Sequence, residues 1–320
     1  MDIKQIQDLG IKIKKNISKV IVGKDEIIEL ITTSVISGGN ILLEDVPGTG
    51  KTVLAKTLAK SIDAEFKRVQ FTPDLLPSDL TGINFYNQKL GEFVLRKGPI
   101  FTNILLADEI NRATPRTQSS LLECMEEKQV TIDGETYKLG ELFFIIATQN
   151  PVEIQGTFPL PAAQLDRFTM MINMGYPTVE EGKRIFKRFI EHNPLGELKE
   201  VCSLSEIIDA QKSFSKVFVH DELQEYMLNI SDRTLDYDGI ILGVSPRGSL
   251  ALLKTCQAYA ALLGREFVTP EDVKKLSPYV LGHRIILKDS LRIKGVKGAD
   301  MIAKILNEIA VPTEDWKAKL

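Results

Sequence analysis

The feature that most constrains this 320-residue chain is a glycine-rich segment between an apolar run and a helical pattern. Residues 42–52 read LLEDVPGTGKT. A phosphate-binding loop has Gly, four further residues and then Gly-Lys-Ser/Thr, and it joins a strand to a helix. Gly50, Lys51 and Thr52 match that pattern, but Asp45 stands at its leading position. Because Asp45 falls at the end of the expected strand, away from the glycines that must approach phosphate, the segment still predicts a nucleotide site.

Each matching residue has a defined task in such a loop. Gly48 and Gly50 let the chain turn tightly and bring backbone N–H groups close to phosphate oxygens. Lys51 is expected to reach the β- and γ-phosphates, and the Thr52 hydroxyl is expected to hold Mg²⁺. The cofactors predicted on this basis are ATP and Mg²⁺. The predicted nucleotide-binding residues of the loop are Pro47, Gly48, Thr49, Gly50, Lys51, Thr52 and Val53.

A second motif supplies two acids at the end of another apolar run. Residues 103–113 read NILLADEINRA. Ligands of an open parallel sheet gather at the carboxyl ends of its strands. We expect Asp108 to contribute to the magnesium site and Glu109 to orient and polarise the attacking water. Two acids after a strand are by themselves more typical of a polar loop, but together with the upstream loop they indicate hydrolysis.

Three more polar residues follow in positions that suit the same site. The run ELFFIIATQNP, residues 141–151, ends with an amide, Asn150, that would hydrogen-bond the attacking water or the γ-phosphate. Arg167 lies in LPAAQLDRF, and Arg247 lies in SPRGSL. Taken singly, Asn150 marks a strand exit and each arginine is a solvated charge. From the residues alone, the predicted catalytic groups are therefore Glu109 and Asn150.

The order of apolar runs and helical patterns predicts an α/β chain in two domains. Five short apolar runs, typical of buried parallel strands, occupy residues 40–45, 66–72, 103–109, 141–150 and 168–174. Residues 83–98 and 130–139 predict two inserted β-hairpins, the second with an Asp133-Gly134 turn. Beyond residue 178 the patterns are helical, with a helix start at Thr269-Pro270. We expect an ATPase core over residues 1–178 and an all-helical domain over residues 179–320.

Composition excludes several classes of protein. The net charge of −3 and the pI near 5.8 argue against a dedicated nucleic-acid binder. Three scattered cysteines lack metal-binding spacing and suit a reducing compartment. The N-terminus has no signal-peptide pattern and no apolar run is long enough to span a bilayer, so we expect a cytoplasmic protein without a membrane span.

The ordered set of motifs resembles the MoxR family of AAA+ ATPases over essentially the whole chain. The resemblance implies an αβα core with five parallel strands and a helical lid. It implies that Asn150 is sensor 1, Arg247 is sensor 2 and Arg167 is the arginine finger, with Arg112 as a rival for the finger. Val22 and Gly23, in VIVGKDEII, are implied to line the adenine. The two hairpins match the helix-2 insert and the pre-sensor-1 insert, which face the central pore in related rings.

The resemblance also implies a cellular role. It favours an ATP-driven chaperone that acts as a homo-oligomeric ring, expected to be a hexamer, on proteins with von Willebrand factor A domains. Three alternatives stay open: a nucleic-acid motor, a metal-insertion subunit similar to those of magnesium chelatase, and a nucleotide-controlled scaffold that hydrolyses poorly. The motor is suggested by the inserted hairpins, which helicase loaders and replicative helicases share. The basic stretch HRIILKDSLRIKGVK, residues 283–297, could also support it, but this stretch reads more simply as a solvated face.

Overall fold

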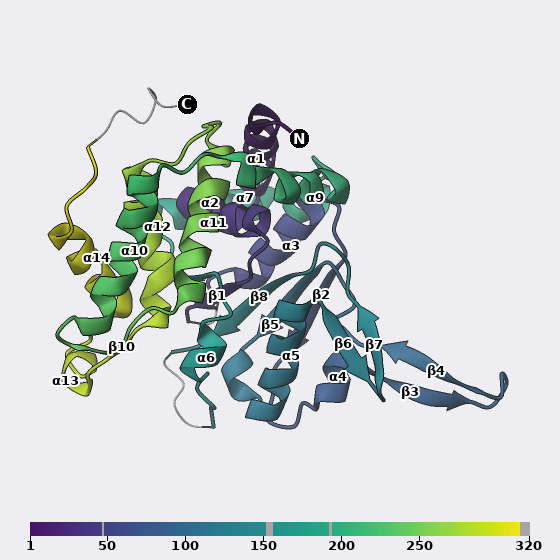
Figure 1. Cartoon of the computed structure of the whole chain (residues 1–320). Helices are drawn as coiled ribbons and strands as arrows, with labels where there is room; N and C mark the ends of the chain where they lie inside the picture. Colours follow the sequence, from purple (N-terminus) through teal and green to yellow (C-terminus); the bar gives the residue numbers. More distant parts are fainter. Residues whose placement is uncertain (47, 152–155, 192–193, 314–320) are drawn as a thin grey trace.

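A five-stranded parallel sheet forms the centre of the N-terminal half of the molecule (Figure 1). The structure is a computed structural model, and it describes residues 1–46, 48–151, 156–191 and 194–313. The strand order is β2-β5-β8-β1-β9. The strands are β1 (Ile41–Glu44), β2 (Phe66–Gln70), β5 (Ile104–Asp108), β8 (Phe144–Gln149) and β9 (Met170–Ile172). All five apolar runs of the sequence therefore form the predicted strands.

Helices cover both faces of this sheet because its strands are apolar on both faces. Alternate residues of β5 point to opposite sides: Leu106 belongs to the same buried cluster as Leu54, whereas Leu105 belongs to a second cluster with Leu121. The first cluster includes α3 (Lys51–Ser61), and the second includes α5 (Pro115–Glu127). The predicted αβα core is confirmed. Its short helices are α4 (Pro77–Thr81), η1 (Ile110–Arg112) and α6 (Ala162–Leu165).

Two antiparallel hairpins interrupt the core where the sequence predicts them. The first pairs β3 (Gly82–Asn87) with β4 (Glu92–Lys97), and the second pairs β6 (Gln129–Ile132) with β7 (Glu135–Lys138). Asp133 and Gly134 have φ angles of 50° and 87°, as a tight hairpin turn of this kind requires. The β3–β4 hairpin projects away from the rest of the molecule (Figure 1).

The C-terminal domain is helical, with one exception. A two-stranded antiparallel sheet of β10 (Ile240–Leu242) and β11 (Ile286–Leu287) lies within it, which the sequence did not predict. The predicted helix start is confirmed, since Thr269 is the N-cap of α12. The helical elements are α7 (Val179–Glu191), α8 (Pro194–Glu197), α9 (Leu204–Ser213), η2 (Phe214–Lys216), α10 (Asp221–Asp236), α11 (Pro246–Leu262), α12 (Pro270–Leu281), η3 (Gly282–Arg284), α13 (Asp289–Arg292) and α14 (Gly298–Glu308).

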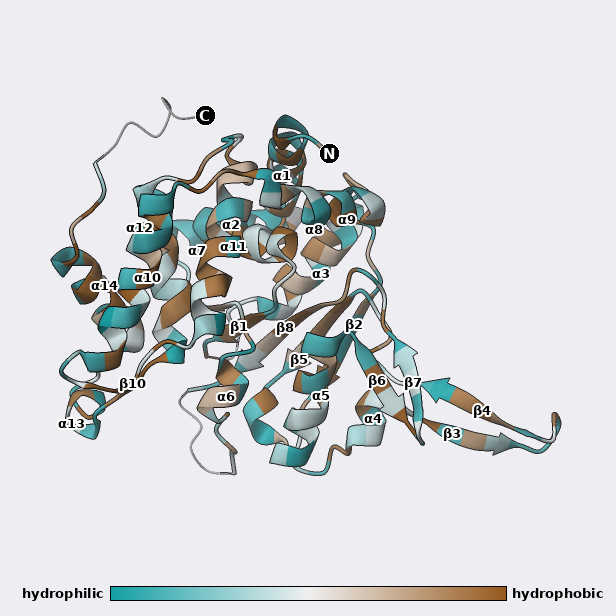
Figure 2. Ribbon diagram, viewed as in Figure 1, coloured by the Kyte–Doolittle hydropathy of each residue, from teal (hydrophilic) through white to brown (hydrophobic). Residues whose placement is uncertain are grey.

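The first two helices join the two halves of the chain. Helices α1 (Ile3–Ile17) and α2 (Asp25–Ser37) pack against each other and against α9 and α11, and α1 also contacts α3. One buried apolar cluster consequently runs from Ile3 to Leu306, and the apolar residues gather between the layers (Figure 2). The boundary after residue 178 stays a prediction. Within the described part of the chain, no helix is long and apolar enough to cross a lipid bilayer.

Candidate nucleotide-binding site

The glycine-rich loop leads from β1 into the N-terminus of α3, as predicted. Gly48 and Gly50 have φ angles of 87° and 91°, in a backbone region that residues with a side chain rarely adopt. Gly50 is the N-cap of α3 and the first turn of the helix carries no acid, so its amide groups and the positive end of its dipole suit an anion. Pro47, also predicted as part of this loop, lies outside the described residues.

Lys51 folds back over the loop that precedes it. Its Nζ donates to the carbonyl oxygens of Asp45 and Val46, each at 2.9 Å. An ammonium group binds phosphate oxygens more strongly than neutral carbonyl oxygens. A phosphate group in the loop is therefore expected to take these hydrogen bonds from Lys51.

Asp108 lies at the carboxyl end of β5, and its carboxylate accepts three hydrogen bonds. The Thr148 hydroxyl donates to Asp108 Oδ1 at 2.6 Å. Arg68, on the neighbouring strand β2, donates to Asp108 Oδ2 from Nε at 3.1 Å and from Nη2 at 2.7 Å. The parallel register of β2 and β5, in which Gln70 lies opposite Asp108, brings Arg68 to this carboxylate. A cation accordingly already neutralises the side chain that is predicted to bind metal.

Glu109 adopts a backbone conformation that is unusual for a residue with a side chain. Its φ is 57° and its ψ is 51°, in the left-handed region. Its N–H donates to Thr148 Oγ1 at 2.8 Å. Its Oε2 accepts from Gln70 Nε2 at 2.7 Å and lies 3.0 Å from Arg112 Nε. The Thr148 hydroxyl thus ties both acids to β8, while Gln70 and Arg112 orient the Glu109 carboxylate.

These elements enclose a pocket of about 350 Å³. Eight predicted site residues line it: Gly48, Gly50, Lys51, Thr52, Val53, Asp108, Glu109 and Asn150. Thr49 is not among the lining residues, and its hydroxyl donates to the carbonyl of Val46 at 3.4 Å. The lining also contains residues that the sequence did not single out for the site: Asp45, Arg68, Gln70, Thr148 and Gln149.

The oxygen groups of the pocket fit Mg²⁺ bound together with a nucleotide. Mg²⁺ prefers oxygen ligands and usually takes one or two protein groups, with water and phosphate oxygens completing its shell. Thr52 and Asp108 offer a hydroxyl and a carboxylate. Asp45 Oδ2 is buried without a hydrogen-bond partner in the described structure. No cluster of three or more His, Cys, Asp or Glu side chains that could hold a metal ion occurs among the described residues, so the ion would need the phosphates.

Besides Thr49, four predicted site residues among the described ones do not line this pocket. Arg167 Nη1 lies 3.5 Å from Glu126 Oε2 and donates to the carbonyl of Leu122 at 2.8 Å. Arg247 Nη2 pairs with Glu126 Oε1. The structure therefore brings the two arginines together on α5. Their catalytic roles stay predictions. Val22 and Gly23, which were predicted to line the adenine, are also absent from the lining of this pocket.

The segment at Val22 and Gly23 lies under the first helix of the C-terminal domain. Val22 is buried, and Gly23 has a φ of 73°. The Glu181 side chain of α7 approaches Gly23 so closely that a side chain at this position would collide with it. Arg188, also on α7, donates to the carbonyls of Ser18 and Lys19 at 3.0 and 2.6 Å. The adenine-binding role of the segment stays a prediction.

Comparisons with known proteins agree with this architecture. Residues 40–170 match the family model of ATPases associated with various cellular activities (AAA), and residues 233–305 match the AAA lid domain. The chain is 46% identical over 303 residues to the uncharacterised protein YeaC of Bacillus subtilis (strain 168), with 95% of each chain covered.

Two further relatives extend the match over nearly the whole chain. Chaperone MoxR1 of Mycobacterium tuberculosis is 37% identical over 305 residues, which cover 92% of this chain and 80% of MoxR1. A crystal structure of a candidate ATPase from Cytophaga hutchinsonii superposes with a TM-score of 0.89 at 38% identity, covering 97% of this chain and 98% of that one. The chain belongs to the MoxR family of AAA+ ATPases.

Proposed function

We propose that the pocket binds and hydrolyses ATP. The observation that carries this proposal is the Thr148 hydroxyl, which bonds both Asp108 and Glu109 beside the phosphate-binding loop. The loop amides and Lys51 would bind the phosphates. Thr52 and Asp108 would hold Mg²⁺, which when bound neutralises developing phosphate charge.

Glu109 is placed to act as the base in this reaction. Its carboxylate lines the pocket, and its hydrogen bonds from Gln70 and Arg112 fix its orientation. It would orient the attacking water and accept its proton as the water oxygen bonds to the γ-phosphorus. The bond between that phosphorus and the bridging oxygen then breaks, and ADP leaves with this oxygen. The amide of Asn150 lines the same pocket and would hydrogen-bond that water or the γ-phosphate.

We infer further that the active form is a homo-oligomeric ring, with six subunits as the proposed number. Arg167 and Arg247 lie together at Glu126 and outside the pocket of their own chain, which supports action on the pocket of a neighbour. An arginine supplied in this way is worth roughly 10³–10⁵ in rate. Arg167→Ala should therefore bind ATP but hydrolyse it slowly. Mixing it with Glu109→Gln subunits should restore activity, and no recovery would exclude Arg167 from the role.

An exposed apolar stripe on α7 supports assembly. Val179, Phe186 and Ile190 share one face of this helix and are 76%, 71% and 83% exposed. Large exposed apolar patches mark interaction sites in soluble proteins. Lys183 is exposed on the same face, between Val179 and Phe186, and Lys187 is exposed beside it, so the stripe also carries positive charge.

The proposed clients are proteins, with von Willebrand factor A domain proteins as the first candidates. Support comes from the β3–β4 hairpin, which projects from the molecule (Figure 1). On it, Tyr86 and Phe93 form an edge-to-face ring pair and are 54% and 72% exposed. Apolar side chains at such a tip suit contact with polypeptide. A purified von Willebrand factor A domain protein should bind the Glu109→Gln ring with ATP and not without it. Equal binding in both cases would contradict ATP-dependent remodelling.

The nucleic-acid motor is less well supported. Within the basic stretch, His283 and Arg284 are buried, and Lys288 and Arg292 pair with Asp238 and Asp289 at 2.7 and 3.2 Å. Few of its charges thus remain for phosphate contacts. Strong, salt-sensitive stimulation of ATP hydrolysis by single- or double-stranded DNA would favour the motor instead.

A further inference from the structure

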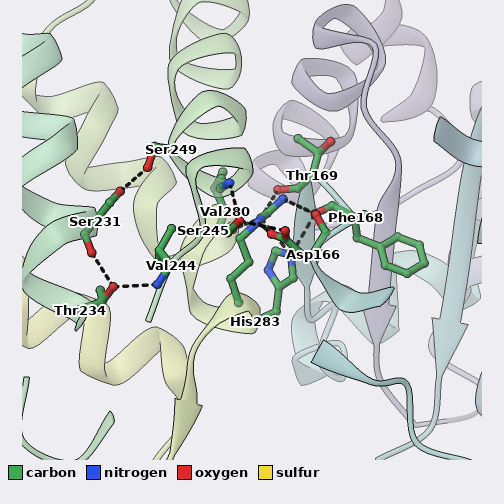
Figure 3. Close-up of polar contacts among 12 residues, drawn as sticks. Asp166, Phe168, Thr169, Ser231, Thr234, Val244, Ser245, Ser249, Val280 and His283 are labelled. Carbon is green, nitrogen blue, oxygen red and sulfur yellow. Dashed lines mark hydrogen bonds and ion pairs between the residues drawn. The ribbon is translucent and has the colours of Figure 1, made fainter. Parts of the chain in front are cut away.

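A buried arginine of the lid domain, Arg284, is hydrogen-bonded to the core segment that contains Arg167. The Arg284 side chain is 2% exposed. Its Nε donates to Asp166 Oδ1 at 2.8 Å, and its Nη2 donates to the carbonyls of Asp166 and Phe168 at 3.2 and 2.7 Å. Its Nη1 donates to the carbonyl of Thr169 at 3.2 Å. The carbonyls of Asp166 and Phe168, the residues before and after Arg167, are therefore bonded to one lid side chain, in the region drawn in Figure 3.

The same arginine is anchored within the lid. Its Nη1 also donates to the carbonyl of Val280 in α12, so the guanidinium joins α12 directly to the segment before β9. A second lid group reaches the same carboxylate, since the Ser245 hydroxyl donates to Asp166 Oδ2 at 2.9 Å (Figure 3). Ser245 is the N-cap of α11, and Arg247 follows it two residues later. Asp166 thus connects two lid elements to the core.

We propose that Arg284 is a positioning residue for Arg167. Through Arg284, the lid domain would determine the position of the Arg167 side chain relative to the nucleotide pocket of the neighbouring subunit. The proposal rests on the proposed function, because it requires that Arg167 act in trans. Arg284 touches neither the pocket nor its lining, so its effect passes through the backbone of residues 166–169. A movement of the lid would carry this backbone with it and move the finger relative to the next pocket.

The chemistry of the contact requires a guanidinium. Its planar fork presents five N–H donors in fixed directions, and here they meet a carboxylate and several backbone carbonyls at once. The ammonium group of lysine is a single point with three donors and cannot reach acceptors on several sides. Arg284→Lys therefore keeps the positive charge but loses most of the hydrogen bonds to residues 166–169. Since a misplacement of about 1 Å can lower a rate about 100-fold, we expect the kcat for ATP to fall by about that factor.

The test separates a misplaced finger from a damaged pocket. In rings of Arg284→Lys alone, kcat should fall while the KM for ATP stays unchanged, because each subunit keeps its own pocket intact. Mixing these subunits with Glu109→Gln subunits should restore activity, since the latter supply a well-placed Arg167. Random one-to-one mixing creates such an interface about one time in four in a head-to-tail ring. Mixing Arg284→Lys with Arg167→Ala should restore nothing, since neither supplies a working finger.

Two matched variants control for loss of a buried ion pair and of a helix cap. Arg265 makes a two-pronged pair with buried Asp272 inside the lid, at 2.8 and 2.6 Å, and Arg265→Lys should leave kcat unchanged. If Arg284→Lys does not fold, Ser245→Ala carries the test, because it removes a bond to Asp166. Ser245→Thr should restore the rate, and Ser203→Ala, which removes the N-cap of α9, should not lower it.

Two results would overturn the proposal. One is an Arg284→Lys ring with the kcat of the wild type. The other is a slow Arg284→Lys ring that Glu109→Gln subunits do not rescue, in an experiment where they do rescue Arg167→Ala. If the Arg167→Ala mixture itself shows no recovery, the trans action of Arg167 in the proposed function is wrong, and the positioning role is overturned with it.

Discussion

Replacing Thr148 by valine tests the hydrogen bonds that hold the two acids of the pocket. Thr148 is fully buried, and valine has nearly the same shape, so the substitution removes a hydroxyl with little change in packing. It deletes a 2.6 Å bond to the Asp108 carboxylate and leaves the Glu109 N–H without its 2.8 Å acceptor. A hydrogen bond to a charged group contributes about 1.5–3 kcal/mol, and an unsatisfied buried donor costs about 1–3 kcal/mol.

The expected loss in the free energy of unfolding is therefore roughly 2.5–6 kcal/mol, measured by urea denaturation. Turnover should fall further than stability explains, because Glu109 loses a bond that holds its left-handed backbone, and a base displaced by about 1 Å can slow the reaction about 100-fold. Thr148→Ser should retain most of the activity. Thr255→Val is the matched control: Thr255 is equally buried but bonds only the carbonyl of Ala251 in its own helix. Wild-type phosphate release by folded Thr148→Val would refute this account.

Two further predictions concern the phosphate loop and the lid. Lys51→Ala should weaken ATP binding about 10- to 100-fold in calorimetry, because it removes a charged hydrogen-bond donor. The control Lys56→Ala, on the exposed side of α3, should leave ATP binding unchanged. Unchanged binding by Lys51→Ala would exclude Lys51 as a phosphate ligand. Burial, followed by the charge of Arg284, lowers the pKa of His283 to about 3. Since the unfolded chain protonates His283 near pH 6.5, acid favours unfolding, and wild type should lose about 2 kcal/mol more than His283→Gln between pH 7 and pH 5. Parallel stability curves for the two proteins would contradict a buried neutral imidazole.

Local patterns were sufficient to predict the loop and the two acids. Gly50, Lys51 and Thr52 are adjacent in sequence, and Asp108 and Glu109 directly end an apolar run, so no long-range information was needed. The strands β1, β5 and β8 were recognisable because each is a continuous apolar run buried on both faces, whereas the edge strand β2 carries Lys67 and Arg68 and is only partly buried. The β10–β11 pair was missed because strands of three and two residues are too short to show periodicity.

The partners of the site residues depend on strand order and on packing between domains. Arg68 and Gln70 reach the acids only because β2 lies beside β5, which no local pattern specifies. Nothing in the sequence predicts a role for Thr148 in the site, apart from its position just before the two amide residues at the end of β8. In the same way, Arg284 sits in a basic stretch that reads as a solvated face. Its burial against Asp166 follows from the docking of η3 on α6 and β9.

The most direct test of the proposed ATPase is to measure ATP binding and turnover in the same preparations of wild type, Glu109→Gln and Glu123→Gln. Glu123 is an exposed glutamate of α5 and serves as the matched control. The account predicts that all three bind ATP with similar affinity and that only Glu109→Gln loses turnover, by a factor of about 10²–10⁴, as expected for removal of a general base. Equal turnover by Glu109→Gln and wild type, or no turnover by wild type at ring-forming concentrations, would contradict it.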